Sequence, residues 1–355
     1  ITLPDNSIKS FEEYPKGMDV ARGISEGFAR NCVAMEIEGQ LIDLNQEIKE
    51  DCHIRLISTK DAEALEILRH SCAHVMAEAV QNLYNDAKLT IGPVVEDGFY
   101  YDIDMAPISE DDFPAIEAEM KKIVKAKKPF ERSEVSKGEA LEMFKDNPYK
   151  VELINELGDE TISIYKQGGF IDLCRGPHIP QTGMIKGVKL MKTSGAYWRA
   201  DQEREQLQRL YGTAFFDKKE LKQYIHMIEE AKKRDHRKIG SRMGLFSFHQ
   251  EAAGMPFFHA KGMDMWNALL EYWRDEHRAA GYVETKTPVM LSRHLWEKSG
   301  HWENYRENMY TSVVDEEEYA IKPMNCPGGM ILYKTESHSY RDLPLRAGEI
   351  GLVHR

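Results

Sequence analysis

The stretch from Glu63 to Leu83 constrains the fold most, because its apolar residues recur at the spacing of one helix face. That apolar stripe comprises Leu65, Leu68, Cys72, Val75, Met76, Ala79 and Leu83. At about 100° per residue, His70 and His74 project roughly opposite the stripe, and their spacing of four makes the two imidazoles neighbours. Small residues surround them where a solvated helix would carry Lys and Glu. The pattern predicts that something packs or binds there, with two ordinary histidines at the edge of a core as the alternative.

A second pair with the same spacing, Cys174 and His178, lies in the Gly-Pro loop of Ile171-Asp-Leu-Cys-Arg-Gly-Pro-His178. The two pairs together are a ligand set that a tetrahedral zinc ion accepts. The helix differs from the zinc-protease motif, because Ser71 stands where that motif requires Glu. The four residues are therefore candidate ligands, and Cys174 is also a candidate nucleophile.

Composition narrows the class of protein further. A chain of 355 residues is long enough for two or three domains, and 42% hydrophobic with 30% charged residues predicts folded, soluble ones. No run of about 18 apolar residues occurs, so no membrane span or signal peptide is expected. Five cysteines without paired spacing favour a reducing cytosol. The net charge of -12 argues against a protein that coats nucleic acid indiscriminately.

Local patterns divide the chain into four segments. Residues 1–60 read as a hairpin, a helix interrupted by Gly23 and Gly27, and three strands, which is the order of a β-grasp unit. Residues 61–216 read as an α+β domain around the two site pairs. A charged helix from Lys218 to about Lys238 follows as a spacer, and 241–355 suggest half of an antiparallel-sheet domain. The basic runs 121–128 and 232–238 are, taken alone, typical of solvated helix faces.

Motifs near the end of the chain closely resemble a known family. Lys322-Pro-Met-Asn-Cys-Pro, Ser339-Tyr-Arg-Asp-Leu-Pro-Leu-Arg346 and Val353-His-Arg355 resemble the class II core of bacterial-type threonyl-tRNA synthetases. Earlier motifs agree in order: Arg69-His-Ser-Cys-Ala-His74, Asp172-Leu-Cys-Arg-Gly-Pro-His178, Gly195-Ala-Tyr-Trp198 and Arg234-Asp-His-Arg-Lys-Ile-Gly240. The resemblance spans the whole chain, which is expected to be the N-terminal part of such an enzyme.

The resemblance implies an α+β multidomain protein with four parts. These are a TGS β-grasp domain at 1–60, an α+β editing domain at 61–216, a linker helix at 217–240, and the start of the class II antiparallel-sheet aminoacylation domain at 241–355. Motif 1, from Tyr282 to Pro288, would lie at a homodimer interface. Arg355 would hold the α-phosphate of ATP, and Met324 would contact substrate.

Cys326 would be one ligand of the family's catalytic zinc, with both histidine partners beyond Arg355. Because a catalytic zinc site requires three protein ligands, this chain is expected neither to hold that zinc nor to aminoacylate. Cys326 is accordingly expected to be a buried, inert thiol here.

The full-length relatives imply a cytoplasmic enzyme that charges tRNA(Thr) with threonine, using ATP and Mg²⁺. Serine differs from threonine by one methyl, worth about 1–3 kcal/mol of discrimination, so a second, hydrolytic site must clear Ser-tRNA(Thr). By similarity, that site comprises His70, His74, Tyr101, Lys150, Asp172, Cys174 and His178.

The roles implied for these residues follow from ester hydrolysis. Lys150 and the histidines would handle water and the leaving group, Asp172 would bind the amine of the seryl group, and Cys174 would shape a metal-free pocket rather than attack. With this resemblance, run 232–238 becomes a candidate contact to the tRNA backbone. An RNA-binding or regulatory module without autonomous hydrolysis is the alternative, and a free-standing trans-editing factor is a third possibility.

Overall fold

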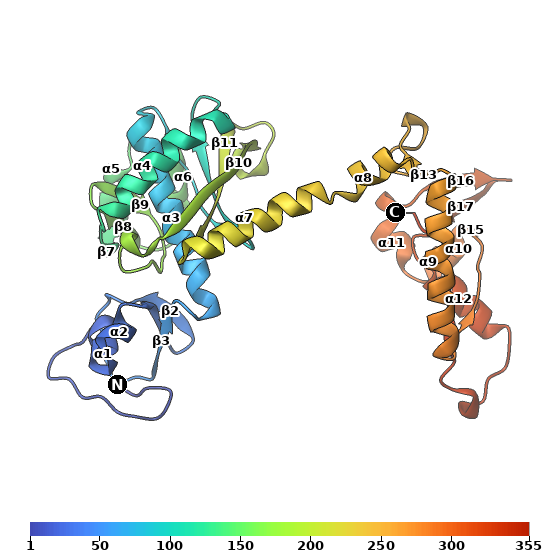
Figure 1. The fold of residues 1–355 in the computed structure, drawn as a ribbon, viewed down its shortest axis with the longest axis horizontal. Helices are drawn as coiled ribbons and strands as arrows, with labels where there is room; N and C mark the ends of the chain where they lie inside the picture. The colour runs from blue at the N-terminus through green and yellow to red at the C-terminus, as the bar shows by residue number, and fades with distance from the viewer. Residues whose placement is uncertain (355) are drawn as a thin grey trace. The chain divides into compact units, whose positions relative to one another are not determined.

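The computed structural model describes residues 1–354, and the chain divides into two compact units, Ile1–Lys232 and Lys233–Arg355 (Figure 1). Within the first unit we distinguish an N-terminal lobe, residues 1–58, and a central lobe, residues 61–216. The boundaries expected at 60/61, 216/217 and 240/241 remain predictions.

The N-terminal lobe is a small sheet covered by short helices. Its strands follow the order β2-β1-β3 and are antiparallel, and their bounds are β1 Cys32–Ile37, β2 Gln40–Asp43 and β3 Ile54–Ser58. The predicted helix is split into α1, Gly17–Ile24, and α2, Glu26–Ala29. The split falls at Ser25 rather than at the glycines, because the Ser25 hydroxyl accepts the N–H of Phe28 and starts a new helix. The expected N-terminal hairpin is reduced to one bridge between Thr2 and Ile8.

A five-stranded antiparallel sheet and a long helix form the core of the central lobe. The sheet has the order β10-β11-β6-β4, with β5 also paired to β6. Helices α3, Ala62–Leu83, and α4, Phe113–Lys125, pack on each other and on this sheet (Figure 1). The strands are β4 Lys88–Leu89, β5 Val94–Val95, β6 Gly98–Asp104, β10 Gly187–Tyr197 and β11 Gln206–Phe215.

A second, three-stranded sheet carries the loop with Cys174 and His178. It is antiparallel with the order β7-β8-β9. Helices α5 and α6 connect β7 to β8 and pack against the sheet through Ala140, Ile154 and Ile162. The bounds are β7 Glu131–Ser136, α5 Lys137–Met143, α6 Pro148–Glu156, β8 Thr161–Gln167 and β9 Phe170–Leu173.

The middle of helix α3 is buried on all sides rather than along one stripe. Every residue from Ser71 to Val80 is buried, whereas Leu83, predicted to belong to the stripe, is 42% exposed. The reason is that α3 is surrounded by packing partners: the large sheet, α4, and residues Val33, Ala34 and Ile57 of the N-terminal lobe share one core with it. On the histidine side, the ring of His74 packs edge-on against Phe130 and Phe170. The two lobes share hydrophobic surface.

The charged spacer is two helices, not one. Helix α7 spans Lys218–Lys233 and α8 spans His236–Met243. The break follows from Asp235, whose side chain accepts the N–H of Arg237 and caps α8. In the run 121–128, most lysines are exposed as expected, but Lys128 pairs with the buried Glu78.

The second unit combines helices with small sheets. Strands β15, β17 and β16 form an antiparallel sheet, and β12 pairs with β13 in the same sense. Strands β14 and β18 form a parallel pair, which the long crossover between them permits. The helices are α9 Ala260–Ala279, α10 Arg293–Lys298, α11 His301–Tyr305 and α12 Cys326–Lys334, and the strands are β12 Phe246–Ser247, β13 Phe257–Phe258, β14 Val283–Glu284, β15 Met290–Ser292, β16 Thr311–Val314, β17 Glu317–Ile321 and β18 Ala347–Gly348.

Across residues 1–354, no helix combines the length and apolar character needed to cross a membrane.

Shortening a buried side chain of α3 should destabilise the first unit. Leu68 is fully buried, so Leu68→Ala is expected to lower the free energy of unfolding by about 2–5 kcal/mol through the lost contacts and the cavity left behind. The matched change Leu83→Ala, on the exposed end of the same helix, should change it by less than about 0.5 kcal/mol. Urea unfolding followed by circular dichroism measures both, and equal losses would contradict the packing described.

Candidate functional site

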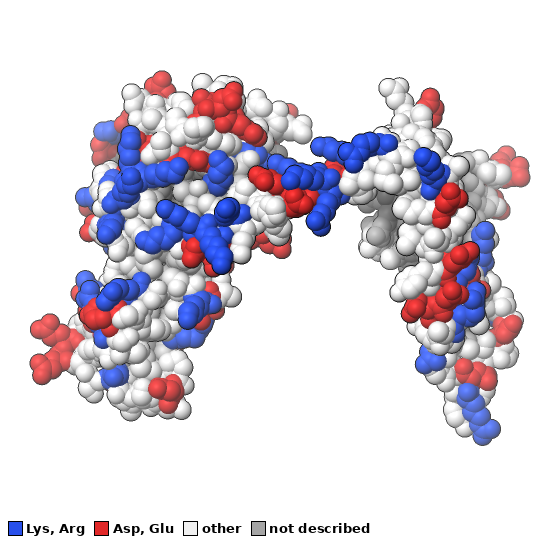
Figure 2. Space-filling model, viewed as in Figure 1, with Lys and Arg blue, Asp and Glu red and all other residues white. Residues whose placement is uncertain are grey.

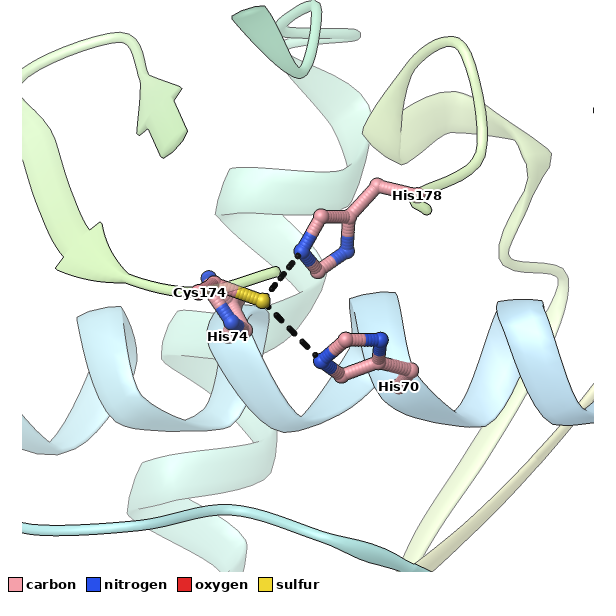
Figure 3. Close-up of side chains that lie close together, drawn as sticks. All are labelled: His70, His74, Cys174 and His178. Atoms are coloured by element: carbon pink, nitrogen blue, oxygen red, sulfur yellow. Dashed lines mark hydrogen bonds between the residues drawn. The ribbon is translucent and has the colours of Figure 1, made fainter. Parts of the chain in front are cut away.

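The two sequence-predicted pairs meet in the central lobe. His70 and His74 come from α3, and Cys174 and His178 come from the loop after β9 (Figure 3). Their ligand atoms all lie within 4.8 Å of one another. The Cys174 Sγ is 3.2 Å from Nε2 of His70 and 3.3 Å from Nε2 of His178. The four side chains therefore form one compact cluster.

The loop between Cys174 and His178 requires a glycine at its centre. Gly176 has φ 76°, a left-handed conformation that side chains disfavour. A Cβ on Gly176 would lie 1.8 Å from the hydroxyl of Tyr165, so the loop backbone rests directly on that tyrosine. The Gly176 N–H also donates to Cys174 Sγ at 3.3 Å. This tight return carries His178 back against α3.

Ser71 has a structural role that its sequence position did not disclose. Its hydroxyl donates to the Ile67 carbonyl at 2.8 Å, accepts the Ile179 N–H at 3.0 Å, and lies 3.0 Å from Nδ1 of His178. Since the one hydroxyl proton goes to Ile67, we assign the proton between Ser71 and His178 to Nδ1 of the imidazole. Nε2 of His178 then faces Cys174 as an acceptor.

A second cluster contains the three residues that only the resemblance had proposed. Lys150 Nζ lies 2.5 Å from Oδ1 of Asp172, and the Tyr101 hydroxyl donates to Oδ2 at 2.5 Å. Lys150 also donates to the Tyr101 oxygen at 3.3 Å. Asn147 caps α6 by accepting the N–H of Lys150, which fixes the first turn of the helix from which this lysine reaches inward. The side chains of Lys150, Asp172 and Tyr101 are almost fully buried.

Both clusters border one cavity of about 450 Å³, within the usual size range of small-molecule pockets. Six of the seven predicted residues line it, namely His70, His74, Tyr101, Lys150, Asp172 and Cys174. His178 does not; it lies behind the wall, 1% exposed, with its ring stacked on Phe130 at 4.8 Å. A larger hollow of about 1150 Å³ in the N-terminal lobe is lined by loop residues 8–15 and 47–53 and lacks this set of buried ionisable groups.

Burial makes the histidines neutral. It lowers the pKa of His74 to about 3, against the opposing attraction of Asp172. It also lowers the pKa of His70, and takes that of His178 well below its ordinary value. Nδ1 of His74 is buried and has no hydrogen-bond partner among residues 1–354. This atom is closed to solvent and is therefore a buried polar group without a partner, whereas the other ring nitrogen, Nε2, lies 3.9 Å from Oδ2 of Asp172.

Burial and nearby charges shift the pKa values of Asp172 and Cys174 in the cavity. Burial alone would raise the pKa of Asp172, but the ammonium of Lys150 and further contacts hold it below the ordinary value. Burial raises the pKa of the Cys174 thiol to about 12. The nucleophile is the thiolate, so this environment argues against nucleophilic attack by Cys174.

Three histidines and one cysteine could supply four ligands to a zinc ion. A set of four protein ligands is typical of closed, structural zinc sites, because a hydrolytic zinc keeps one position for water. The geometry therefore accommodates a metal without favouring metal-assisted hydrolysis.

The residues proposed for the class II core lie in the second unit. Met324 is 37% exposed, with Sδ 3.0 Å from Nε2 of His301. The expectation that Cys326 is buried is wrong: Pro327 and Gly328 take the buried positions at the start of α12, and Cys326 is exposed. Within residues 1–354 it belongs to no group of three ligating side chains. Arg355 lies outside the described residues.

The lowered pKa values of the site histidines can be checked directly. A pKa below the ordinary value of about 6.5 means that the ring gains its proton only in more acidic solution, so the NMR ring signals of His74 and His178 should not shift between about pH 8 and pH 5. The unfolded chain does bind protons below about pH 6.5, so the free energy of unfolding should fall as the pH is lowered through that window. Each ring signal is assigned by its loss from the spectrum of His74→Gln or His178→Gln. A midpoint near 6.5 for either residue would contradict the burial described.

Comparisons with known proteins agree with the resemblance. The TGS domain matches residues 1–58, and the threonyl and alanyl tRNA synthetase second additional domain matches residues 162–211. Over its whole length the chain is 87% identical to the threonine–tRNA ligase of Desulforapulum autotrophicum and 71% identical to that of Desulfatibacillum aliphaticivorans. The threonine–tRNA ligase of Clostridioides difficile is 53% identical over 359 aligned positions.

The chain spans 56% of the length of each of these relatives. The crystal structure of the RNA-binding domain of threonyl-tRNA synthetase from Cryptosporidium parvum Iowa II shares 41% identity over 34% of this chain and 31% of its own, with a TM-score of 0.34. The predicted family and the predicted TGS and editing domains are confirmed by the sequence matches. Along all of its residues, the chain belongs to the threonine–tRNA ligase family.

Proposed function

We propose that the cavity of the central lobe hydrolyses the aminoacyl ester of Ser-tRNA(Thr). The observation that carries this proposal is the arrangement at the cavity wall, where the buried Lys150–Asp172 ion pair lies beside the neutral His74, whose Nε2 is 3.9 Å from Oδ2 of Asp172. The substrate is the ester between serine and the 3′-terminal adenosine. Ester hydrolysis requires a buried charge that stabilises the oxyanion and a neutral group that orients water, and this wall carries both.

Each step of the reaction has a candidate group. The neutral His74 on the cavity wall orients the attacking water, because its low pKa suits it to orient water rather than to hold a proton. The ammonium of Lys150 directs two of its donors to Asp172 and Tyr101, and the third stabilises the oxyanion and gives its proton to the ribose oxygen as the ester C–O bond breaks. The proton that the attacking water loses restores the ammonium, so the products are free serine and the ribose hydroxyl.

Asp172 retains capacity for the amino group of serine. Oδ1 receives Lys150 and the N–H of Leu173, and Oδ2 receives the Tyr101 hydroxyl. A carboxylate has about four acceptor positions, so one remains on Oδ2. Cys174 shapes the wall as a thiol, and His178 holds it from behind through the 3.3 Å contact.

Substitution of the proposed catalytic groups should stop proofreading. Lys150→Ala and His74→Ala are each expected to slow deacylation of Ser-tRNA(Thr) by about 10²-fold or more, because each removes a group that acts on the reacting atoms. Deacylation of Ser-tRNA(Thr) and Thr-tRNA(Thr) is measured in parallel, and the wild-type chain should prefer the seryl ester.

Lys145→Ala is the matched control, since Lys145 is 59% exposed and precedes the same helix. It should keep the wild-type rate. Circular dichroism confirms that each variant is folded, and a binding assay follows tRNA affinity. If the folded wild-type chain binds tRNA and hydrolyses neither ester, the proposed hydrolysis is wrong, and the alternative function, an RNA-binding module without hydrolysis, takes its place.

Hydrolysis is proposed to need no metal. Zinc content by elemental analysis should be far below one ion per chain in both the wild type and Cys174→Ala, and a chelator should leave the deacylation rate unchanged, because the proposed steps use side chains alone. Stoichiometric zinc in the wild type that Cys174→Ala removes would contradict this proposal.

The names of the relatives support a wider role for the full-length protein. We propose that it charges tRNA(Thr) with threonine in the cytoplasm, using ATP and Mg²⁺, as a homodimer with a zinc ion in its aminoacylation domain. Cys326, Met324 and Arg355 are its proposed zinc, substrate and ATP contacts in this chain.

The basic run 232–238 is the proposed contact to the tRNA backbone. Every Lys and Arg from Lys232 to Lys238 is exposed, and Figure 2 shows basic side chains gathered around this part of the chain. Phosphate contacts of this kind position an RNA without reading its sequence.

A further inference from the structure

Asp43, a buried carboxylate of the N-terminal lobe, forms hydrogen bonds to the central lobe. Asp43 is the last residue of β2 and is 9% exposed. Its oxygens both bond to residues of the central lobe: Oδ1 accepts the backbone N–H of His178 at 2.8 Å, and Oδ2 accepts the hydroxyl of Tyr165 at 2.5 Å. These bonds join segments that are more than one hundred residues apart in the sequence.

Two backbone N–H groups of the loop behind the cavity are held by other segments. Pro177 and Pro180 have no N–H, so His178 and Ile179 carry the backbone donors of the segment 177–180. The Ile179 N–H bonds to Ser71 of α3, and the His178 N–H bonds to Asp43. One helix of the central lobe and one strand of the N-terminal lobe therefore hold the two N–H groups of this segment, while the Pro180 carbonyl accepts the N–H of Phe130.

Tyr165 links the same carboxylate to the turn of the loop. Its hydroxyl lies where a Cβ of Gly176 would be, and its ring meets that of His178 edge-on at 4.5 Å. Asp43 fixes the orientation of the Tyr165 hydroxyl and thereby the surface on which Gly176 rests. Cys174, which lines the cavity, begins the loop that this contact supports.

We propose that Asp43 is a positioning residue of the hydrolytic cavity, so that the N-terminal lobe completes the site by holding the loop of Cys174 and His178 in place. This inference rests on the proposed hydrolysis of Ser-tRNA(Thr). Asp43 touches no reacting atom; it acts through His178 and Tyr165. The TGS lobe is then part of the editing apparatus and not only a docking module.

Two substitutions at Asp43 separate its bonds from its charge. Asp43→Ala removes both bonds and should lower kcat for Ser-tRNA(Thr) deacylation by about ten-fold or more, with KM within about two-fold, because the cavity wall shifts while the RNA-binding surface does not. Asp43→Asn keeps an oxygen for the His178 N–H, and its amide can donate to the Tyr165 oxygen. It should restore kcat to within about three-fold of the wild type.

Leu44→Ala is the matched control, because Leu44 is the next residue, is 1% exposed, and belongs to the core of the N-terminal lobe. It weakens the same lobe without touching the loop, and below its melting temperature it should keep the wild-type kcat. A wild-type kcat in Asp43→Ala, or an equal loss in Leu44→Ala, would overturn the proposal.

Hydrogen exchange gives a readout that does not depend on activity. In a peptide covering 175–180, Asp43→Ala should lose protection at the His178 amide, and Asp43→Asn and Leu44→Ala should not. If the wild type hydrolyses nothing, the proposed function fails, and the exchange data still decide whether Asp43 anchors the loop. Unchanged protection in Asp43→Ala would show that it does not.

Discussion

A lysine and an aspartate that are each about 3% exposed form the contact on which the central lobe depends. Lys150 and Asp172 lie 2.5 Å apart, and the loss of either partner would leave an uncompensated buried charge worth about 3–5 kcal/mol. The pair is tolerated because the Tyr101 hydroxyl and the Leu173 N–H donate two further hydrogen bonds to Asp172. Three elements, α6, β9 and β6, must therefore meet at one point, and their meeting defines the inner wall of the cavity.

The same burial gives the histidine cluster its chemistry. Removed from water, the three imidazoles stay neutral and the thiol stays protonated, so the cluster offers acceptors and a shaped wall rather than charge. Charge is supplied separately by Lys150. A cavity with a cation on one side and neutral acceptors on the other can orient water and stabilise an oxyanion without requiring either group to change its protonation state beforehand.

Residues behind the cavity fix the position of its wall. His178 is stacked on Phe130, bonded to Ser71 and held through its backbone by Asp43. The shared core of α3 with Val33, Ala34 and Ile57 brings the N-terminal lobe close enough for that last bond. Hydrophobic packing between the lobes thus places a polar contact, and the polar contact fixes a loop of the site.

The sequence by itself determined the local features. The spacing of four within a helix places His70 and His74 side by side because helical geometry depends only on neighbouring residues, and the order of helix and strands in the N-terminal lobe follows from equally local signals. The resemblance of short motifs added Tyr101, Lys150 and Asp172, which no periodicity would have singled out. Only the tertiary structure decided that the middle of α3 is buried all round, that His178 stands behind the cavity, that Cys326 is exposed, and that Asp43 reaches the loop. Burial and hydrogen-bond partners such as these join residues distant in the chain, and they arise from the packing of whole elements, which the pattern along one segment does not encode.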